Sequence, residues 1–192
     1  MAKPVLDDKV STKRTYILLL KSLFDLLTEK PFEKITLTEL CDRAMIPRST
    51  FYRYFEDKHD LLRFGIYAFF HDASFNGDTV YVQDVYSIRS FMLAIIKLLG
   101  HDRGRYYRLY QVNKNGDFMD ILKQYLSDIL DMKIRESEEQ GVCLKISQPV
   151  LIYLLTDFYF SAVKGFLELT EPESVDSYVD DVCLFFEKDF FK

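Results

Sequence analysis

The sequence of 192 residues contains no tryptophan, three cysteines and three histidines. Cys41, Cys143 and Cys183 lie far apart and are odd in number, which argues against a disulfide framework and fits a reducing compartment. A glycine-rich phosphate loop and a Gly-x-Ser-x-Gly turn are also missing, so these nucleotide-binding and hydrolase motifs are excluded. We therefore expect no enzymatic activity, no cofactor and no bound metal.

Each of the three histidines, His59, His71 and His101, is followed directly by an aspartate. Such a dipeptide can ligate metals in helical phosphohydrolases, which makes a metal-dependent phosphohydrolase an alternative function. No further histidine completes a ligand cluster, however, and the small number of candidate ligands argues against this alternative.

Long hydrophobic runs are scarce as well. The N-terminal segment has no apolar core of signal-peptide length. The most apolar stretch, Pro149–Val163, is short for a bilayer and contains Asp157. These features predict a soluble protein of the cytoplasm, with no membrane partner.

Charge of either sign is not in large excess. The formal net charge of −5 argues against indiscriminate nucleic-acid binding. Residues 1–60 carry 11 basic and 10 acidic side chains, whereas residues 61–192 carry 14 and 20. Any contact with DNA therefore depends on where the basic residues are placed rather than on their number.

The dominant pattern in the sequence is helical. Apolar residues recur at steps of three and four, as at Ile17, Leu20, Phe24 and Leu27, and strand alternation is hardly seen. We expect helices over about 11–29, 37–44, 48–54, 57–70, 84–99, 117–139 and 149–169, and a last one after Pro172. Between the helices over 84–99 and 117–139, Gly104 and the Asn113–Gly116 cluster interrupt the helical pattern. The whole pattern predicts an all-α fold of about nine helices, with an N-terminal three-helix domain and a larger helical domain after it.

Two of the expected helices are short and adjacent. Thr36 and Glu39 form a capping-box pattern at the start of the helix over 37–44. Pro47 suits the first turn of the next helix, over 48–54, because its missing amide hydrogen costs nothing there. Two short helices joined by a turn of about three residues define a helix-turn-helix, whose second helix enters the major groove.

A set of residues with characteristic spacing spans this region: Ile35, Thr36, Leu40, Ala44, the run Ser49–Phe55, Lys58, Leu61 and Leu62. Together with the helix that begins near Lys13, the segment resembles the N-terminal DNA-binding domain of the TetR/AcrR family of bacterial regulators. Two residues depart from the family pattern. Met45 replaces a usual glycine, which strains the turn if its φ is positive, and Pro47 replaces a usual capping serine.

The resemblance implies a homodimer that binds a double-stranded, pseudopalindromic DNA operator. It implies a helix-turn-helix domain in residues 1–57 and a helical ligand-binding and dimerisation domain in residues 58–192. The implied function is that of a transcriptional repressor. An unidentified small-molecule effector would change the distance between the DNA-binding domains of the two protomers.

The residues expected to contact DNA are Thr36, Thr38, Arg48, Ser49, Thr50, Tyr52, Arg53, Tyr54 and Lys58. Hydroxyls at the start of the first short helix suit phosphate oxygens, although Thr36 also serves as a structural cap. Arg48 can bind guanine O6 and N7 from the first turn of the second helix, and Lys58 can hold a phosphate. The alternative for both basic residues is a solvated surface position.

Phe51 and Phe55 lie four residues apart, and we expect them in the core against Phe24, Leu40 and Leu61. Their burial would turn the polar side of the same helix outward. A helical adaptor that dimerises without binding DNA remains an alternative. A surface that does not bind DNA, however, would have no reason to keep the polar residues expected to contact it.

Four tyrosines, Tyr67, Tyr106, Tyr110 and Tyr125, are candidates to line the ligand pocket, because they are aromatic with a polar tip. Ordinary core packing is the alternative for each. The expected helix over 149–169 is apolar almost all round, which calls for burial on two sides, and the last helix carries an apolar stripe on one face. We expect these two helices to form the dimer interface as a four-helix arrangement.

Overall fold

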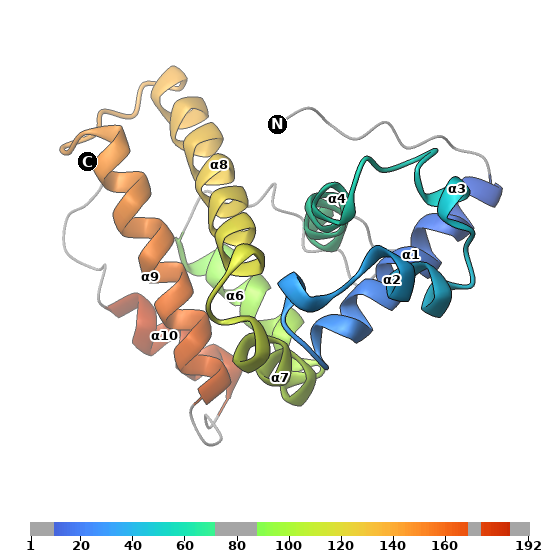
Figure 1. Ribbon diagram of the computed structural model, residues 1–192. Helices are drawn as coiled ribbons and strands as arrows, with labels where there is room; N and C mark the ends of the chain where they lie inside the picture. Colours follow the sequence, from blue (N-terminus) through green and yellow to red (C-terminus); the bar gives the residue numbers. More distant parts are fainter. Residues whose placement is uncertain (1–9, 72–87, 169–173, 185–192) are drawn as a thin grey trace. The chain divides into compact units, whose positions relative to one another are not determined.

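The structure is a computed structural model that describes residues 10–71, 88–168 and 174–184 (Figure 1). Within these ranges it has nine α-helices, one 3₁₀ helix and no strand, so the predicted all-α class is confirmed. The elements are α1 (Val10–Leu27), η1 (Phe32–Lys34), α2 (Leu37–Ala44), α3 (Arg48–Phe51), α4 (Lys58–His71), α6 (Ile88–Gly100), α7 (Arg103–Asn113), α8 (Asp117–Glu139), α9 (Gln148–Glu168) and α10 (Val175–Leu184).

The chain divides into two compact units. The first comprises residues 1–77 and 105–122, and the second comprises residues 78–104 and 123–192. Helices α4 and α7 thus pack with the N-terminal helices, and α8 begins in the first unit and continues in the second. The division between these units differs from the domain boundary expected after residue 57. The functions assigned to the two expected domains stay predictions.

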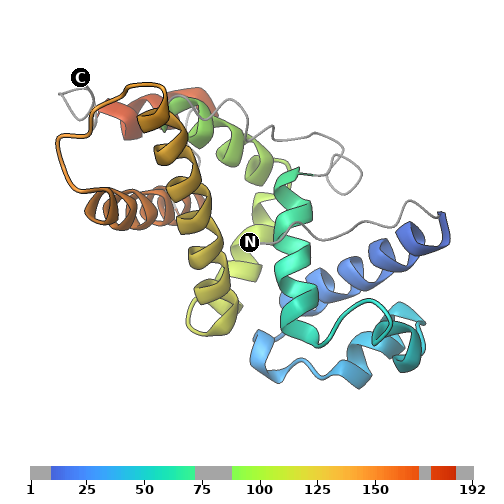
Figure 2. The same cartoon turned by 90° about the horizontal axis from the view of Figure 1, so that it is seen from above.

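The core of the first unit is built on α1, which packs along α2 and crosses α4 (Figures 1 and 2). Leu19, Leu20, Leu23, Leu26 and Leu27 are at most 1% exposed, as the helical periodicity requires. Their spacing turns one face of α1 inward along its whole length. The helix therefore supports α2, against which α3 packs in turn.

An aromatic cluster fixes the end of α3 to this core. Phe51 and Phe55 are 0% and 5% exposed, which confirms their predicted burial. Their ring centroids lie 5.6 Å apart, and Phe55 also contacts the rings of Tyr16 and Phe64. Such edge and tilted contacts add to the stability gained from burial alone.

The start of α2 shows one half of the predicted capping box. Thr36 Oγ1 accepts a hydrogen bond from the backbone N–H of Glu39, at 3.2 Å. The Glu39 carboxylate accepts a hydrogen bond from the Lys30 ammonium, at 2.6 Å, rather than reaching back to the cap. The helix still begins and ends where predicted, at Leu37 and Ala44.

Helix α3 is shorter than predicted. It ends at Phe51 as a regular α-helix, and the next residues continue as turns in which the N–H of Tyr54 donates to the carbonyl of Phe51, at 2.9 Å. The helix begins at Arg48, as predicted, and Pro47 stands at its N-cap position, where the family pattern has a capping serine. Because proline cannot cap with its side chain, α3 starts without a side-chain cap.

The turn between α2 and α3 contains the strained residue that the sequence predicted. Met45 has φ 53° and ψ 38°, the left-handed region that favours glycine. Its backbone N–H donates to the Asp42 carbonyl, and the N–H of Ile46 donates to the Cys41 carbonyl. The Met45 side chain is 84% exposed, so packing contributes little to offset the strain.

In the second unit, α6 packs against both α9 and α10. The rings of Phe91 and Tyr159 meet edge to face with centroids 4.9 Å apart, and both side chains are 2% exposed. Gly165 lets α10 approach α9, because an added Cβ would lie 2.8 Å from the Tyr178 hydroxyl. That hydroxyl donates to the carbonyl of Ala162, at 2.5 Å.

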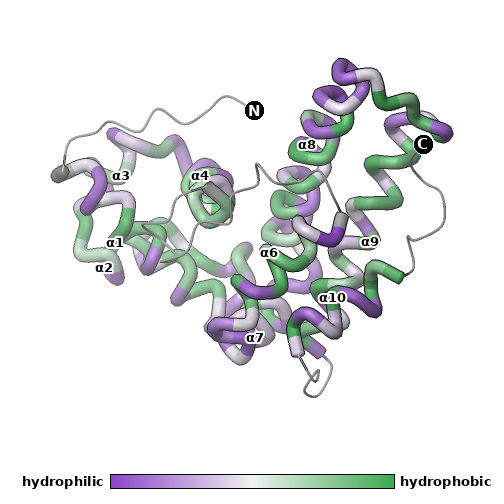
Figure 3. Tube along the Cα trace, turned by 180° about the vertical axis from the view of Figure 1, so that it is seen from behind, coloured by the Kyte–Doolittle hydropathy of each residue, from purple (hydrophilic) through white to green (hydrophobic). Residues whose placement is uncertain are grey.

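Helices α8 and α9 run antiparallel in this unit. Lys123 pairs with Asp157 at 3.2 Å, and Gln148 donates to Asp131 at 2.8 Å, so residues later in α8 meet residues earlier in α9. Figure 3 shows that apolar residues dominate α9, whereas polar and apolar residues alternate along α8. Helix α8 has the bounds that the sequence predicted, residues 117–139.

Among the described helices, α9 alone is long and apolar enough to cross a membrane by length and composition. It is longer than the apolar stretch that was expected to be too short for a bilayer. Leu151, Leu155, Tyr159 and Phe166 recur at helical spacing and are all at most 5% exposed. One side of α9 therefore lies in the core of the second unit, and length and composition alone are weak evidence for a membrane span.

We expect Met45→Gly to stabilise the protein by about 1 kcal/mol, because glycine adopts the left-handed turn without strain and little burial is lost. The free energy of unfolding in urea measures the change. Met132→Gly is the matched control, since Met132 is 47% exposed inside α8, where glycine should destabilise by about 1 kcal/mol. A loss of stability in Met45→Gly would contradict the interpretation of the turn.

Candidate nucleic-acid interface

Helix α3 and the turns after it have two distinct sides. Phe51 and Phe55 point into the core, as described above. Four residues on the other side are exposed to solvent: Arg48 and Ser49 before Phe51, and Tyr52 and Arg53 between the two rings. Tyr52, an aromatic residue, is 58% exposed. The structure therefore brings most of the predicted contact residues of α3 onto one solvent-facing surface.

The remaining predicted contacts of the two short helices are placed less uniformly. Thr36 and Thr38 are exposed at the start of α2, although the Thr36 hydroxyl also caps the helix. Thr50 is half-buried. Tyr54 is half-buried against Tyr16, with ring centroids 5.3 Å apart, so its ring supports the fold as well. DNA contacts by all these residues stay predictions.

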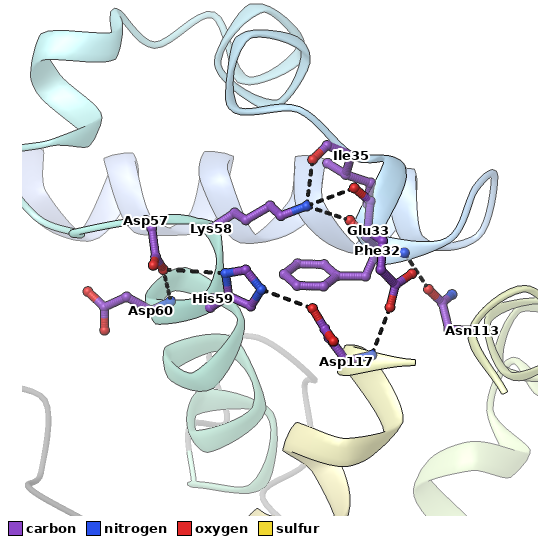
Figure 4. A network of polar contacts seen from close by, with 9 residues as sticks. All are labelled: Phe32, Glu33, Ile35, Asp57, Lys58, His59, Asp60, Asn113 and Asp117. Carbon is purple, nitrogen blue, oxygen red and sulfur yellow. Dashed lines mark hydrogen bonds and ion pairs between the residues drawn. The ribbon is translucent and has the colours of Figure 1, made fainter. Parts of the chain in front are cut away.

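Lys58 lies in an environment that the sequence did not indicate. Its ammonium donates to the carbonyls of Phe32, Glu33 and Ile35, at 2.9, 3.1 and 2.9 Å (Figure 4). It also sits 4.6 Å from the centroid of the Phe32 ring. An ammonium has three N–H donors, and all three have partners here. A phosphate contact, as predicted, would require Lys58 to give up at least one of them.

Burial lowers the pKa of Lys58 below its ordinary value, against the opposing effect of the Glu33, Asp117 and Asp57 charges. The three carbonyls compensate for the water that the ammonium loses. They belong to the η1 corner, which we define as residues 32–35. Lys58 thus ties the first turn of α4 to the corner from which α2 starts.

His59, next to Lys58, extends this network to α8. Its Nε2 lies 3.2 Å from Asp117 Oδ2, and its Nδ1 lies 3.8 Å from Asp57 Oδ1 (Figure 4). The imidazole also meets the Phe32 ring edge to face, with centroids 5.0 Å apart. Asp57 caps α4 as predicted, accepting from the N–H of Asp60 at 2.8 Å. This hydrogen bond is the main cause that lowers the pKa of Asp57.

Glu33 connects the η1 corner to the start of α8. Its carboxylate accepts from the backbone N–H of Asp117, the first residue of α8, at 2.7 Å. Gly116 has φ 128°, and an added Cβ at this position would overlap the Glu33 carboxylate. The absence of a side chain at residue 116 therefore permits the close approach of the corner to α8.

Asn113 completes the network from the end of α7, where it is 2% exposed. Its side-chain oxygen accepts from the Phe32 N–H at 2.9 Å. Its side-chain nitrogen donates to the carbonyls of Leu27, at 2.7 Å, and Leu109, at 2.9 Å. Sequence analysis missed this residue because the Asn113–Gly116 cluster looked like a loop, and its main partner lies 81 positions away.

The four tyrosines proposed as pocket residues do not fall in one unit. Tyr67, Tyr106 and Tyr110 belong to the first unit and are half-buried, whereas Tyr125 belongs to the second and is 6% exposed. The Tyr106 ring packs edge to face on Phe69, with centroids 5.9 Å apart. Their role in ligand binding stays a prediction.

Of the three histidine–aspartate pairs, His71–Asp72 extends outside the described residues, and His59 has other surroundings than a metal site requires. Among the residues that the structure describes, no group of three His, Cys, Asp or Glu side chains could hold a metal ion. His59 contacts Asp117 and Asp57, while the N–H of Asp60 is bound to Asp57. His59 therefore serves the network around the η1 corner.

Residues 19–63 match the sequence profile of bacterial regulatory proteins of the tetR family. These residues run from α1 through the helix-turn-helix into α4. The helix-turn-helix segment therefore matches the DNA-binding domain of the TetR family, and the resemblance indicated by the sequence is confirmed for these residues.

The chain is also similar to individual TetR-family proteins. It is 24% identical over 128 residues to the dhaKLM operon transcriptional activator DhaS of Lactococcus lactis subsp. lactis (strain IL1403). That alignment spans 66% of this chain and 64% of DhaS, less than two thirds of the relative.

Two solved structures share the fold over most of the chain. A TetR regulator from Streptococcus agalactiae 2603V has a TM-score of 0.62 at 18% identity, with 92% of this chain and 95% of that chain covered. FadR from Bacillus subtilis, solved with stearoyl-CoA, has a TM-score of 0.59 at 14% identity, with 90% and 98% covered. At these identities the two structures establish the fold of this chain and nothing about its ligand.

We expect Lys58→Met to lower stability by about 1–3 kcal/mol, because the carbonyls of the η1 corner lose a charged donor. Urea unfolding measures this loss. The slope of DNA affinity against salt should stay unchanged, whereas a phosphate-bound Lys58 would flatten it by about one charge. Lys34→Met, at an exposed position of η1, is the matched control. A flatter slope for Lys58→Met alone would restore the phosphate contact.

Proposed function

We propose that the protein is a sequence-specific repressor that binds a pseudopalindromic operator as a homodimer in the cytoplasm. The observation that carries the proposal is the two-sided arrangement of α3. Burial of Phe51 and Phe55 commits one side to the core and leaves Arg48, Ser49 and Tyr52 exposed on the other. In a helix-turn-helix, this is the side that enters the major groove, and its first turn reads base edges.

The residues proposed to contact DNA have different tasks. Arg48 and Ser49 open α3 and suit base edges, with Arg48 bidentate to guanine. Thr38, at the exposed start of α2, suits a phosphate oxygen, where the helix dipole favours negative charge. Tyr52 and Arg53 suit the sugar–phosphate backbone, which fixes the register of the helix in the groove.

Helices α9 and α10 supply the proposed dimer interface. Val150, Tyr153 and Leu154 on α9 are 49%, 69% and 51% exposed, and Leu184 on α10 is 60% exposed. Exposed apolar side chains grouped on one helix are typical of a surface that is covered in the assembly. We propose a second copy of the chain as the partner that covers this surface, because a two-fold symmetric dimer also places two DNA-binding domains on one duplex.

Regulation by a small molecule is the third part of the proposal. The structure of FadR, which shares this fold, holds stearoyl-CoA, so the fold can accommodate a ligand. A ligand that prefers a dimer with differently spaced heads lowers operator affinity by its differential binding alone. The relative DhaS is named an activator, so transcription from the bound promoter decides between repression and activation.

We expect Arg48→Ala to bind a DNA duplex selected by the parent from a random pool about tenfold more weakly, with relaxed preference at one base pair. Repeating the selection with the variant measures the preference directly. Arg108→Ala removes one exposed arginine from α7 and should leave the preference unchanged. An Arg48→Ala variant that selects the same sequences as the parent would show that α3 docks differently.

We expect Tyr153→Glu to convert the dimer to a monomer, because a charge placed in an apolar interface loses its water without gaining a partner. Sedimentation equilibrium at micromolar concentration measures the molecular mass, and circular dichroism shows whether the helices persist. Tyr107→Glu on α7, where Tyr107 is 40% exposed, is the control. An unchanged mass for Tyr153→Glu would place the interface on another surface.

A further inference from the structure

The backbone groups around Asn113 determine which kind of side chain can be buried at this position. The side chain faces one backbone N–H and two backbone carbonyls, and an amide is the group that offers one acceptor and two donors. At 2% exposure, water cannot replace a missing partner at low cost. The position therefore calls for a neutral amide, although Asn113 itself lies on α7, outside the two short helices.

The backbone that Asn113 holds leads directly to the reading surface. Its partner Phe32 opens the η1 corner, and the corner ends at Ile35, one residue before the cap of α2. Lys58 binds the carbonyls at both ends of this corner, so the start of α4 is fixed to the same backbone. A change at Asn113 thus reaches the N-terminus of α2 through about four residues of chain that are bonded at both ends.

We propose that Asn113 is a positioning residue for DNA binding, which sets the start of α2 through the η1 corner without touching DNA. Glu33 supports it from the other side, because its carboxylate holds the first backbone N–H of α8. The inference rests on the proposed operator binding. In this proposal, the end of α7 and the start of α8 hold the η1 corner, and the corner keeps α2 and α3 in the geometry that binds DNA.

Asn113→Asp tests the proposal with a nearly isosteric change. A carboxylate still accepts from the Phe32 N–H, but it faces the carbonyls of Leu27 and Leu109 without a donor. Burial and these two oxygens raise the pKa of the new carboxyl, and protonation returns one donor. Affinity for the selected duplex should fall about tenfold at pH 8, as for one lost buried hydrogen bond, and recover to within about threefold at pH 6.

Other titratable groups surround the site, so the pH profile needs a control. Lys58 of α4 binds the η1 corner, Glu33 belongs to it, and His59 of α4 contacts the Phe32 ring and Asp117 of α8. The other charged groups are Lys114, beside Asn113 in sequence, and the Arg105–Asp25 pair between α7 and α1.

Asn115→Asp is the matched control, because Asn115 is exposed two residues further along the chain and keeps all these groups in place. Affinity is measured at each pH by titration of a labelled duplex, with circular dichroism to show that the protein is folded. A pH-dependent recovery in Asn113→Asp beyond that of Asn115→Asp supports the proposal. A simple structural loss would lower affinity without recovery at low pH.

Glu33→Ala keeps the proposal testable if Asn113→Asp fails to fold at pH 8. Glu33 is exposed, so its removal should leave the core intact and lower affinity for the same duplex by about threefold to tenfold. Glu138→Ala, at the exposed end of α8, is its control. Folded Asn113→Asp and Glu33→Ala proteins that bind like the parent would overturn the inference. A parent that selects no DNA would overturn the proposed function instead.

Discussion

The helix-turn-helix depends on how the η1 corner is held. Its carbonyls accept from Lys58, and its first backbone N–H donates to Asn113, so side chains from two other helices satisfy the backbone of a short, irregular segment. Backbone groups at such a bend have no regular helical partner, and leaving them unpaired in a buried place is costly. The corner in turn determines where α2 starts and how it meets α1.

The burial of one side of α3 and the turns after it determines which residues remain exposed for DNA. The ring of Phe55 packs against Tyr16 of α1 and Phe64 of α4, and Phe51 packs against Phe55, so α3 and the turns after it have an orientation that buries both rings. The polar residues of this segment then face solvent together. The proposed DNA-binding surface is thus a consequence of core packing, since the apolar spacing of this segment determines which side remains outside.

Local patterns in the sequence predicted the elements that local forces determine. The bounds of α2 and α8, the cap at Thr36, the cap at Asp57 and the burial of Phe51 all depend on residues close in sequence. The strained turn at residue 45 was equally visible, because the usual glycine is missing.

Contacts between distant residues could not be predicted in this way. The partners of Lys58 lie 23 to 26 positions away, and that of Asn113 lies 81 away. Nothing in the adjacent sequence distinguishes a lysine that binds carbonyls from one that binds phosphate. Helix α7 was missed for a related reason, because Gly104 and the Asn113–Gly116 cluster suggested only breaks. The division into units likewise depends on which helices pack together, which periodicity does not specify.

The internal bonding of Lys58 separates two responses to ionic strength. Dissolved ions screen exposed charges over about 10 Å at 0.1 M, but they weaken short, partly buried contacts much less. Arg48 faces solvent and would meet DNA as an exposed charge, whereas the ammonium of Lys58 is enclosed by carbonyls. A rise in ionic strength would therefore weaken the proposed DNA contact of Arg48, whereas the hydrogen bonds by which Lys58 holds the η1 corner would persist.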